Sequence, residues 1–265
     1  MHLTASKAER AQEPTAEPLE RTTVWSFPNR GNWAGHSGSY RGNWSPHVPR
    51  NLIIRYTRPG GFVLDPMCGG GTTLVEARLL GRDAVGFDIN QEAVSRTARA
   101  LNAVPADPTA EQSVWRGDAR HLTGIANETV DLVTLHPPYA NMIRYSDNTE
   151  GDLSLMNEAL FYDALSQVAA EARRVLRPNG HCAVLMGDTR RRKHVVPLSF
   201  HTLQVFLGTG LLLREHVIKI QHNTTSAARW PGAHDFLLLA HENLFIFRNP
   251  AADEPVDSSR CSKDP

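Results

Sequence analysis

The feature that most constrains the fold is a glycine-rich turn directly after a short apolar run. Residues 61–65 read Gly-Phe-Val-Leu-Asp and are followed by Pro-Met-Cys-Gly-Gly-Gly-Thr-Thr. The apolar run predicts a buried strand, and the glycines allow a tight turn into a helix that we expect over residues 72–80. The free N–H groups at the start of such a helix favour a negatively charged ligand group. No lysine follows the glycines, so the turn does not match the phosphate-binding loop of ATPases.

Strand and helix signals alternate through the rest of the chain. We expect further strands over residues 83–88, 113–116, 130–135, 181–186, 211–220 and 236–247. We expect further helices over residues 91–101, 158–176 and 198–207. This alternation predicts an α/β fold with a mostly parallel sheet and helices on both faces. Ligands of such sheets bind beyond the carboxyl ends of the strands, so the residues that follow each strand are candidate site residues.

Acidic residues stand at the ends of the next two expected strands. Asp88 lies 23 residues after Asp65, a spacing typical of a carboxylate that binds ribose hydroxyls. The alternative role of Asp88 is a helix N-cap, for which Asn90 is better placed. Asp118 follows the strand over residues 113–116 and can accept a hydrogen bond from an adenine amino group. With the glycine turn, these two acids predict a nucleoside-binding crevice.

The most informative segment follows the strand over residues 130–135 and reads His136-Pro137-Pro138-Tyr139. Two prolines make a stiff turn without N–H donors, so its carbonyl oxygens are free to accept hydrogen bonds. Neutral His136 can also accept a hydrogen bond, and the ring of Tyr139 can stack on a base drawn out of its helix. Two acceptors on an exocyclic amino group favour its nucleophilic geometry in a transition state. We therefore predict that these four residues are catalytic; an incidental loop is the alternative.

Charge is balanced over the whole chain but not along it. Lys and Arg number 28, as do Asp and Glu, yet residues 21–64 hold six arginines and no acidic residue. A second basic run comprises Arg190, Arg191, Arg192 and Lys193. Such patches either bind a phosphate backbone or form an ordinary solvated surface. The aromatic residues between the first arginines either stack on bases or belong to the core.

The ends of the chain differ in composition from its middle. Residues 1–22 and 250–265 have few large apolar side chains, so we expect two disordered tails around one domain over residues 23–249. Three scattered cysteines, Cys68, Cys182 and Cys261, fit a reducing cytoplasm and no disulfide framework, and we interpret Cys68 as a packing residue. No apolar stretch is long enough to span a bilayer and no metal-ligand spacing is present. We therefore expect a soluble cytoplasmic protein without a membrane partner or a metal.

Residues 24–249 resemble the amino-methyltransferases acting on DNA, which form N6-methyladenine or N4-methylcytosine. The glycine motif of that family resembles residues 65–73. Its catalytic tetrad, usually Asp, Asn or Ser followed by Pro-Pro-Tyr or Pro-Pro-Phe, resembles His136 to Tyr139. Residues 40–56 resemble its segment that closes over the methionine end of the cofactor, and residues 241–247 its closing strand. The resemblance implies a Rossmann-like, seven-stranded S-adenosylmethionine-dependent methyltransferase fold with one antiparallel strand.

The same resemblance implies ligands for particular residues. The residues expected to bind S-adenosylmethionine are Trp44, Asp65, Met67, Cys68, Gly69, Gly71, Thr72, Asp88, Ile89, Asp118 and Ala119. The residues expected to contact double-stranded DNA are Arg41, Arg144, Arg190, Arg191, Arg192 and Lys193. Little chain remains for a separate target-recognition domain, so we expect loops at residues 140–155 and 221–235 to read the base sequence. A homodimer and a cognate restriction endonuclease stay open as partners.

His136 departs from the family pattern, because an acidic or amide residue is typical of adenine enzymes there and serine of cytosine-N4 enzymes. The helix start at Gly71-Thr72-Thr73 and the C-terminal strand resemble the N4 branch more closely, so we favour cytosine N4 over adenine N6. A guanine-N2 methyltransferase acting on RNA is an alternative, because residues 65–69 and the Pro-Pro-Tyr triplet resemble that family too. A further alternative is an inactive nucleic-acid-binding homologue. Against it, both the glycine turn and Asp88 are intact.

Overall fold

A single large sheet forms the centre of the molecule, whose computed structural model describes residues 19–40, 42–105, 108–139, 144–222, 235–251 and 254. Its eight strands are β1 (Val24–Ser26), β2 (Phe62–Asp65), β3 (Asp83–Asp88), β4 (Gln112–Arg116), β5 (Val130–Leu135), β6 (Leu176–Met186), β9 (Leu212–Ile220) and β10 (His241–Arg248). Their order is β1-β9-β10-β6-β5-β2-β3-β4. Among these strands β10 alone runs antiparallel to both of its neighbours. The predicted α/β class, the mostly parallel sheet and the single antiparallel strand are confirmed.

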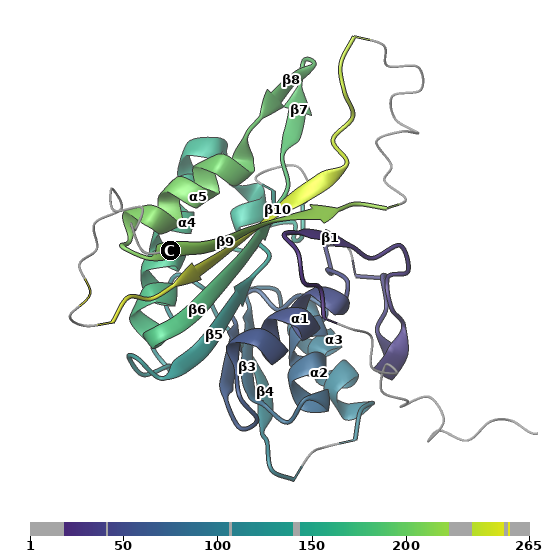
Figure 1. Cartoon of the computed structure of the whole chain (residues 1–265), viewed down its shortest axis with the longest axis vertical. Helices are drawn as coiled ribbons and strands as arrows, with labels where there is room; N and C mark the ends of the chain where they lie inside the picture. The colour runs from purple at the N-terminus through teal and green to yellow at the C-terminus, as the bar shows by residue number, and fades with distance from the viewer. Residues whose placement is uncertain are drawn as a thin grey trace, which may run out of the picture.

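Helices cover both faces of this sheet (Figure 1). One face carries α1 (His47–Tyr56), α2 (Thr72–Leu79) and α3 (Gln91–Asn102), and the other carries α4 (Glu158–Val175) and α5 (Leu198–Gly208). Two 3₁₀ turns, η2 (Trp33–Gly35) and η3 (Leu153–Leu155), lie in the connecting segments. No helix in the described ranges is long and apolar enough to cross a membrane.

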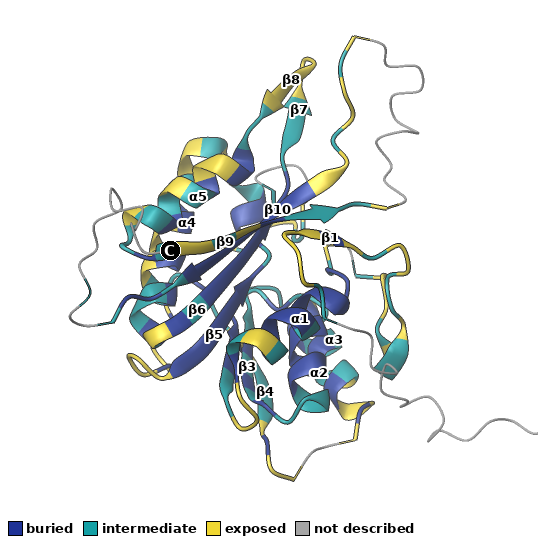
Figure 2. Cartoon of the chain, viewed as in Figure 1, coloured by how far each residue is buried: buried dark blue, intermediate teal, exposed yellow. Residues whose placement is uncertain are grey.

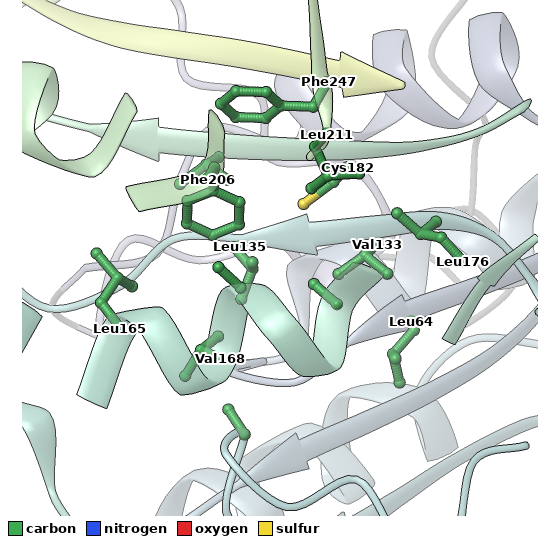
Figure 3. Close-up of a cluster of buried hydrophobic side chains, with 14 of the residues drawn as sticks. Leu64, Val133, Leu135, Leu165, Val168, Leu176, Cys182, Phe206, Leu211 and Phe247 are labelled. Atoms are coloured by element: carbon green, nitrogen blue, oxygen red, sulfur yellow. The ribbon is translucent and has the colours of Figure 1, made fainter. Parts of the chain in front are cut away.

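The core consists of two apolar clusters, one on each side of the sheet. All six residues of β5 are buried, because Val133 and Leu135 face the cluster under α4 and α5 while Leu132 faces the other. Figure 3 shows the first cluster, in which Leu165 and Val168 of α4 point toward β5. Figure 2 shows the same arrangement by burial, with dark central strands and exposed outer helix surfaces. A strand covered on both faces reads as a continuous apolar run rather than an alternating one.

The strand order creates one crevice. From β2 the chain moves outward through β3 to β4, and it then returns to place β5 on the other side of β2. The connections that leave the carboxyl ends of β2 and β5 therefore diverge. A crevice opens at such a switch point, and ligands of open α/β sheets bind there.

The expected boundaries differ from the structure by more than two residues at the starts of two strands, β10 and β6, the second of which was predicted from residue 181 and begins at Leu176. The strand predicted from residue 236 begins at His241, because β9 ends opposite it at Ile220 and residues 235–240 therefore face no strand. Leu237 in that stretch is 85% exposed, so its apolar run does not mark a buried strand. The helix predicted to end at residue 176 ends at Val175, and β6 begins directly after it. Pairing with β5 skips Pro178-Asn-Gly, since Val130 faces Leu176 and Leu132 faces His181.

Besides the two 3₁₀ turns, four described elements were not predicted: β1, α1, β7 and β8. β1 is only three residues long, too short for a periodic pattern, and its parallel pairing with β9 makes the sheet eight-stranded instead of seven-stranded. The start of α1 has no side-chain cap, so the sequence carried no capping signal for this helix. β7 (Thr189–Arg191) and β8 (His194–Val196) form a hairpin whose turn residues, Arg192 and Lys193, have left-handed φ angles of 50° and 69°. Because glycine and asparagine are the usual residues there, the turn gave no signal. Most of the two predicted tails lies outside the described residues.

Candidate active site

A cavity partly open to solvent, with about 800 Å³ of empty space when the adjoining open solvent is included, lies beyond the carboxyl ends of β2, β3, β4 and β5. The predicted site residues in its wall are Trp44, Asp65, Met67, Cys68, Gly69, Asp88, Ile89, Asp118, Ala119, His136 and Pro138. Gly71, Thr72, Pro137 and Tyr139 are adjacent in sequence but do not line it. The fold therefore brings the glycine turn, both strand-end acids and the start of the His-Pro-Pro-Tyr segment to one place.

The glycine turn needs residues without side chains. Gly71 has a left-handed φ of 83° immediately before α2, and a Cβ there would lie 2.8 Å from Cγ2 of Thr97. A Cβ on Gly70 would lie 2.4 Å from Nδ2 of Asn43. The same Asn43 accepts a hydrogen bond of 3.0 Å from the Gly70 amide. The backbone is thus packed closely on both sides, as the three glycines predicted.

Two carboxyl groups, the buried Asp65 and the half-buried Asp88, lie beside this turn. Asp88 accepts hydrogen bonds of 2.9 Å from the amides of Gly69 and Asn90, and Asn90 caps α3 by accepting from the Glu92 amide. The sequence-based choice of Asn90 over Asp88 as the N-cap is therefore confirmed. Burial raises the pKa of Asp88, and it raises the pKa of Asp65 to about 7. Both groups are held by backbone amides at the point where a ligand would enter.

Asp118 is held by a neighbouring cation. Its carboxylate accepts hydrogen bonds of 2.6 Å from Nη2 and 3.0 Å from Nε of Arg120. Burial acts to raise the pKa of Asp118, but the bonds to Arg120 outweigh that effect and the pKa is lowered. Asp118 is thus an ionised acceptor at the cavity wall. Its predicted contact with an adenine amino group stays a prediction.

The segment before α1 supplies part of the cavity wall, and Glu76 joins this segment and the start of α1 to α2. The Glu76 side chain has no exposed surface. It accepts hydrogen bonds of 2.7 Å from the Trp33 indole and 3.1 Å from Arg50, and its Oε1 lies 2.7 Å from Nε2 of His36. Tyr40, Asn43 and Trp44, from the same segment, line the cavity. The sequence reading missed this role of Glu76, because its partners are far away along the chain.

A second wall of the cavity comes from residues 145–153, which the sequence reading assigned to base recognition. Tyr145, Gly151, Asp152 and Leu153 line the cavity. The side-chain amide of Asn90 donates a hydrogen bond of 2.9 Å to the Tyr145 carbonyl. The Tyr145 ring stacks on Tyr40 with centroids 6.2 Å apart. These contacts place the described part of this loop over the cofactor side of the crevice.

His136 lies between two aromatic rings. The Trp44 ring stacks on it with centroids 5.7 Å apart and planes inclined by 20°. Its Nε2 lies 3.3 Å from the hydroxyl of Tyr139, and its buried Nδ1 has no hydrogen-bond partner in the described part of the chain. Burial lowers the pKa of His136; the negative Glu242 opposes this, and the positive Lys219 adds to it. His136 is therefore neutral near pH 7, and its ring lines the cavity while Nδ1 itself is buried.

The comparison with known families shows which family the chain belongs to. The family model of the RMKL-like methyltransferase domain matches residues 54–199, more than half of the chain. The chain belongs to this methyltransferase family. The DNA methylase model matches residues 2–99, which confirms the resemblance to the amino-methyltransferases acting on DNA. Neither match separates the cytosine-N4 branch from the adenine branch.

Two curated relatives and one solved structure are similar to this methyltransferase. The type II methyltransferase M.SmaI of Serratia marcescens is 36% identical over 33% of this chain and 28% of its own length. The tRNA (guanine(10)-N2)-dimethyltransferase of Methanothermobacter thermautotrophicus is 33% identical over 50% of this chain and 37% of its own length. The chain thus spans about a third of these curated relatives. TrmN from Thermus thermophilus superposes with a TM-score of 0.55 at 20% identity, over 79% of this chain and 50% of that chain, which supports the fold.

The site of this methyltransferase fits S-adenosylmethionine, the cofactor of its family. Gly69 of the glycine turn lines the cavity, and Asp88, the residue predicted to bind the ribose hydroxyls, lies in the same wall. Trp44 and Ile89 supply apolar wall. Cys68 is buried, and burial raises the pKa of its thiol well above the usual value, so it is a packing group and no nucleophile.

The predicted DNA-contacting residues of the methyltransferase differ in their surroundings. Arg41 lies outside the described residues, as do most of the loop residues 221–235 and residues 140–143. Arg144, Arg191 and Arg192 are exposed. Arg190 donates a hydrogen bond of 2.6 Å to the Leu237 carbonyl, and Lys193 forms an ion pair with Asp235. Arg190 and Lys193 therefore hold the β7–β8 hairpin against the strand-free segment before β10.

Proposed function

We propose that this protein transfers a methyl group from S-adenosylmethionine to the exocyclic amino group of a flipped base in duplex DNA, with cytosine N4 as the target. One observation carries the proposal. His136 and Pro138 line the same cavity as Asp65 and Asp88, so an amino group bound at His136 would lie next to a cofactor bound at the acids. Positioning of two reactants in this way supplies a large part of the rate of such transfers.

The side chains at the predicted catalytic segment suit an amino group. S-adenosylmethionine supplies an activated methyl group on a positively charged sulfur. His136 accepts a hydrogen bond from the amino group through its unpartnered Nδ1, and the Pro137 carbonyl accepts the other. The two acceptors orient the nitrogen lone pair toward the methyl group. Tyr139 is the residue that we predict to stack on the flipped base.

The choice of substrate rests on the methyltransferases to which this chain is similar. M.SmaI is a type II methyltransferase and the DNA methylase model matches the N-terminal third of the chain, which favours DNA. The match to a tRNA (guanine(10)-N2)-dimethyltransferase covers more of this chain, so guanine N2 in RNA is the second candidate. All three target groups, cytosine N4, adenine N6 and guanine N2, are exocyclic amines and require the same acceptors. A homodimer and a restriction endonuclease partner stay predictions from the sequence.

Nucleoside mass spectrometry tests the proposal directly. Purified protein and isotopically labelled S-adenosylmethionine are incubated with duplex DNA and, separately, with RNA, and the digested nucleosides are analysed. The His136→Ala variant, which lacks the acceptor, is the matched control. N4-methylcytosine in DNA would support the whole proposal, and N6-methyladenine would retain the mechanism and change the base. Methylguanine in RNA alone would favour the second candidate. No product from either substrate, despite cofactor binding, would contradict the proposal.

A further inference from the structure

A hydrogen-bonded chain leads from His136 away from the cavity. Nε2 of His136 lies 3.3 Å from the Tyr139 hydroxyl, which donates a hydrogen bond of 2.6 Å to Oε1 of Glu242. The other oxygen of Glu242 accepts a hydrogen bond of 2.8 Å from Nζ of Lys219. Glu242 and Lys219 are both largely buried, with 9% and 15% of their side chains exposed. The Glu242 carboxylate is therefore a buried charge with two hydrogen-bond partners, and its pair with Lys219 is not a surface ion pair.

The number of protons in this series of hydrogen bonds fixes the tautomer of His136. A tyrosine hydroxyl has one proton, and the 2.6 Å bond directs that proton to Glu242. The Tyr139 oxygen can then only accept from Nε2 of His136, so Nε2 carries the imidazole proton. In the neutral ring the remaining nitrogen, Nδ1, has the lone pair. That nitrogen is the one without a partner in the described residues, on a side chain that lines the cavity.

We infer that Glu242 is a positioning residue, which acts through Tyr139 to hold His136 as the Nε2–H tautomer with Nδ1 as the acceptor and base. The inference rests on the proposed function for the identity of the proton donor. When the substrate amino nitrogen forms its bond to the methyl carbon, the electron pair of the broken C–S bond stays on sulfur. The nitrogen then carries one proton too many. Nδ1 accepts that proton with its lone pair, and the imidazolium formed donates from Nε2 to Tyr139.

The charges around the chain agree with this role. Burial alone acts to raise the pKa of Glu242, but Lys219, His136 and the Tyr139 hydroxyl lower it, so Glu242 stays ionised. Burial, Glu242 and its hydrogen bond raise the pKa of Tyr139 well above 10, so Tyr139 keeps its proton. In the described part of the chain, Glu242 from β10, Lys219 from β9, the Tyr139 hydroxyl after β5 and the Gly42 carbonyl act on His136. The Gly42 carbonyl acts with Glu242 to raise the pKa of His136. The negative charge of Glu242 stabilises the transient imidazolium. The positive charge of Lys219 lowers the pKa of His136, so the ring does not stay protonated.

The orientation of the two rings is fixed by the same surroundings. Trp44 stacks on one face of His136. A Cβ on Gly187 would lie 2.9 Å from Cε2 of Tyr139, so the backbone after β6 packs directly against the phenol ring. These contacts restrict the planes of both rings.

Histidine NMR tests the inference without any substrate. Long-range ¹H–¹⁵N correlation spectra of ¹⁵N-histidine-labelled protein report which ring nitrogen carries the proton, and the His136 signals are identified by their loss in His136→Asn. We expect a neutral Nε2–H ring at pH 7. In Tyr139→Phe the fixed tautomer should be lost. In Glu242→Gln, which retains an acceptor without the charge, the midpoint of His136 titration should fall by about one pH unit. In Glu215→Gln, which removes a charge elsewhere on β9, it should not move.

The kinetic readout is the pH profile of methylation. Glu242→Gln should lower kcat about tenfold with an unchanged KM for S-adenosylmethionine, and it should displace the acid limb of the profile to lower pH. A uniform loss with no displaced limb would indicate a merely structural role and overturn the inference. Thermal unfolding checks that each variant folds. If Glu242→Gln does not fold, Tyr139→Phe provides the same spectral test.

The NMR and product results separate the two proposals. A fixed Nε2–H tautomer that depends on Tyr139, with no methylated base in DNA or RNA, would retain the hydrogen-bonded chain and reject the proposed function. A methylated base together with an Nδ1–H ring, or a tautomer indifferent to Tyr139→Phe, would retain the function and overturn the role of Glu242.

Discussion

The carboxylate of Glu76, in the middle of α2, accepts a hydrogen bond of 2.7 Å from the indole of Trp33. The two residues are separated by 43 positions, yet this contact joins the helix that follows the glycine turn to the segment that supplies part of the cavity wall. His36 and Arg50 reach the same carboxylate. One buried side chain therefore helps to hold the segment that carries Tyr40, Asn43 and Trp44 at the cavity.

Removal of this carboxylate should destabilise the fold and weaken cofactor binding together. Glu76→Ala leaves Arg50 and the Trp33 indole without their acceptor, so we expect a loss of roughly 3 kcal/mol in the free energy of unfolding. Urea unfolding and calorimetric titration with S-adenosylmethionine measure the two effects. Glu92→Ala breaks an exposed ion pair with Arg96 and should change stability by less than about 1 kcal/mol. Equal effects of the two variants would contradict the anchoring role of Glu76.

The left-handed turn at Gly71 should not accept a side chain. Gly71→Ala forces a Cβ into a φ of 83° and toward Thr97, so we expect a destabilisation of about 1–2 kcal/mol and a weaker affinity for S-adenosylmethionine. Gly124→Ala is the matched control, because a Cβ there would meet no atom within 4 Å. A Gly71→Ala protein with normal cofactor affinity would show that the glycine turn does not bind the cofactor closely.

Asp65 should make stability fall as the pH rises. Its pKa is about 7 in the folded protein, because burial disfavours the charged form, and 3.8 is its ordinary value. Between these values the folded state retains a proton that the unfolded chain releases, so stability is lost from about pH 4 to about pH 7, by up to about 4 kcal/mol. Asp65→Asn does not titrate. The difference in free energy of unfolding between variant and wild type should therefore grow in favour of the variant as pH rises, and a constant difference would refute it.

Methylation should persist into mild acid. Burial lowers the pKa of His136, so the neutral acceptor survives below the ordinary histidine value of about 6.5, and activity is lost only when pH falls further. The acid limb of kcat should thus have its midpoint below pH 6.5. His136→Asn keeps an acceptor that does not titrate, and its profile should lack this limb. A midpoint above pH 6.5 in the wild type would contradict a buried, neutral His136.

The exposed arginines of the β7–β8 hairpin should contribute to DNA affinity through phosphates. If each contacts one phosphate, Arg191→Ala with Arg192→Ala should reduce the slope of log affinity against log salt by about 2. The reduction should not depend on DNA sequence. Arg55→Ala with Arg58→Ala is the control, because those exposed arginines precede β2 at the opposite end of the sheet. An unchanged slope in the hairpin variant would exclude this surface from the DNA path.

Local patterns in the sequence were sufficient for much of the fold. The apolar run before Asp65, the glycine turn and the cap at Asn90 each depend on residues within a few positions, so β2, α2, β3 and α3 were predicted closely. β5 was predicted without error because a strand buried on both faces is continuously apolar. The stretch before His241 was assigned wrongly for the converse reason, since an apolar run without a partner strand does not extend a sheet.

The sequence by itself was sufficient to predict the family, the crevice and the His-Pro-Pro-Tyr segment, because each depends on residues that are consecutive or close along the chain. Only the tertiary structure decided which side chains complete them. Glu242 reaches Tyr139 across 103 positions because the sheet order places β10 beside β6, and β6 beside β5. Glu76 reaches Trp33 because the N-terminal segment packs over α2. A buried charge is stabilised by whichever partners folding brings within hydrogen-bond distance, and spacing along the chain carries no information about them.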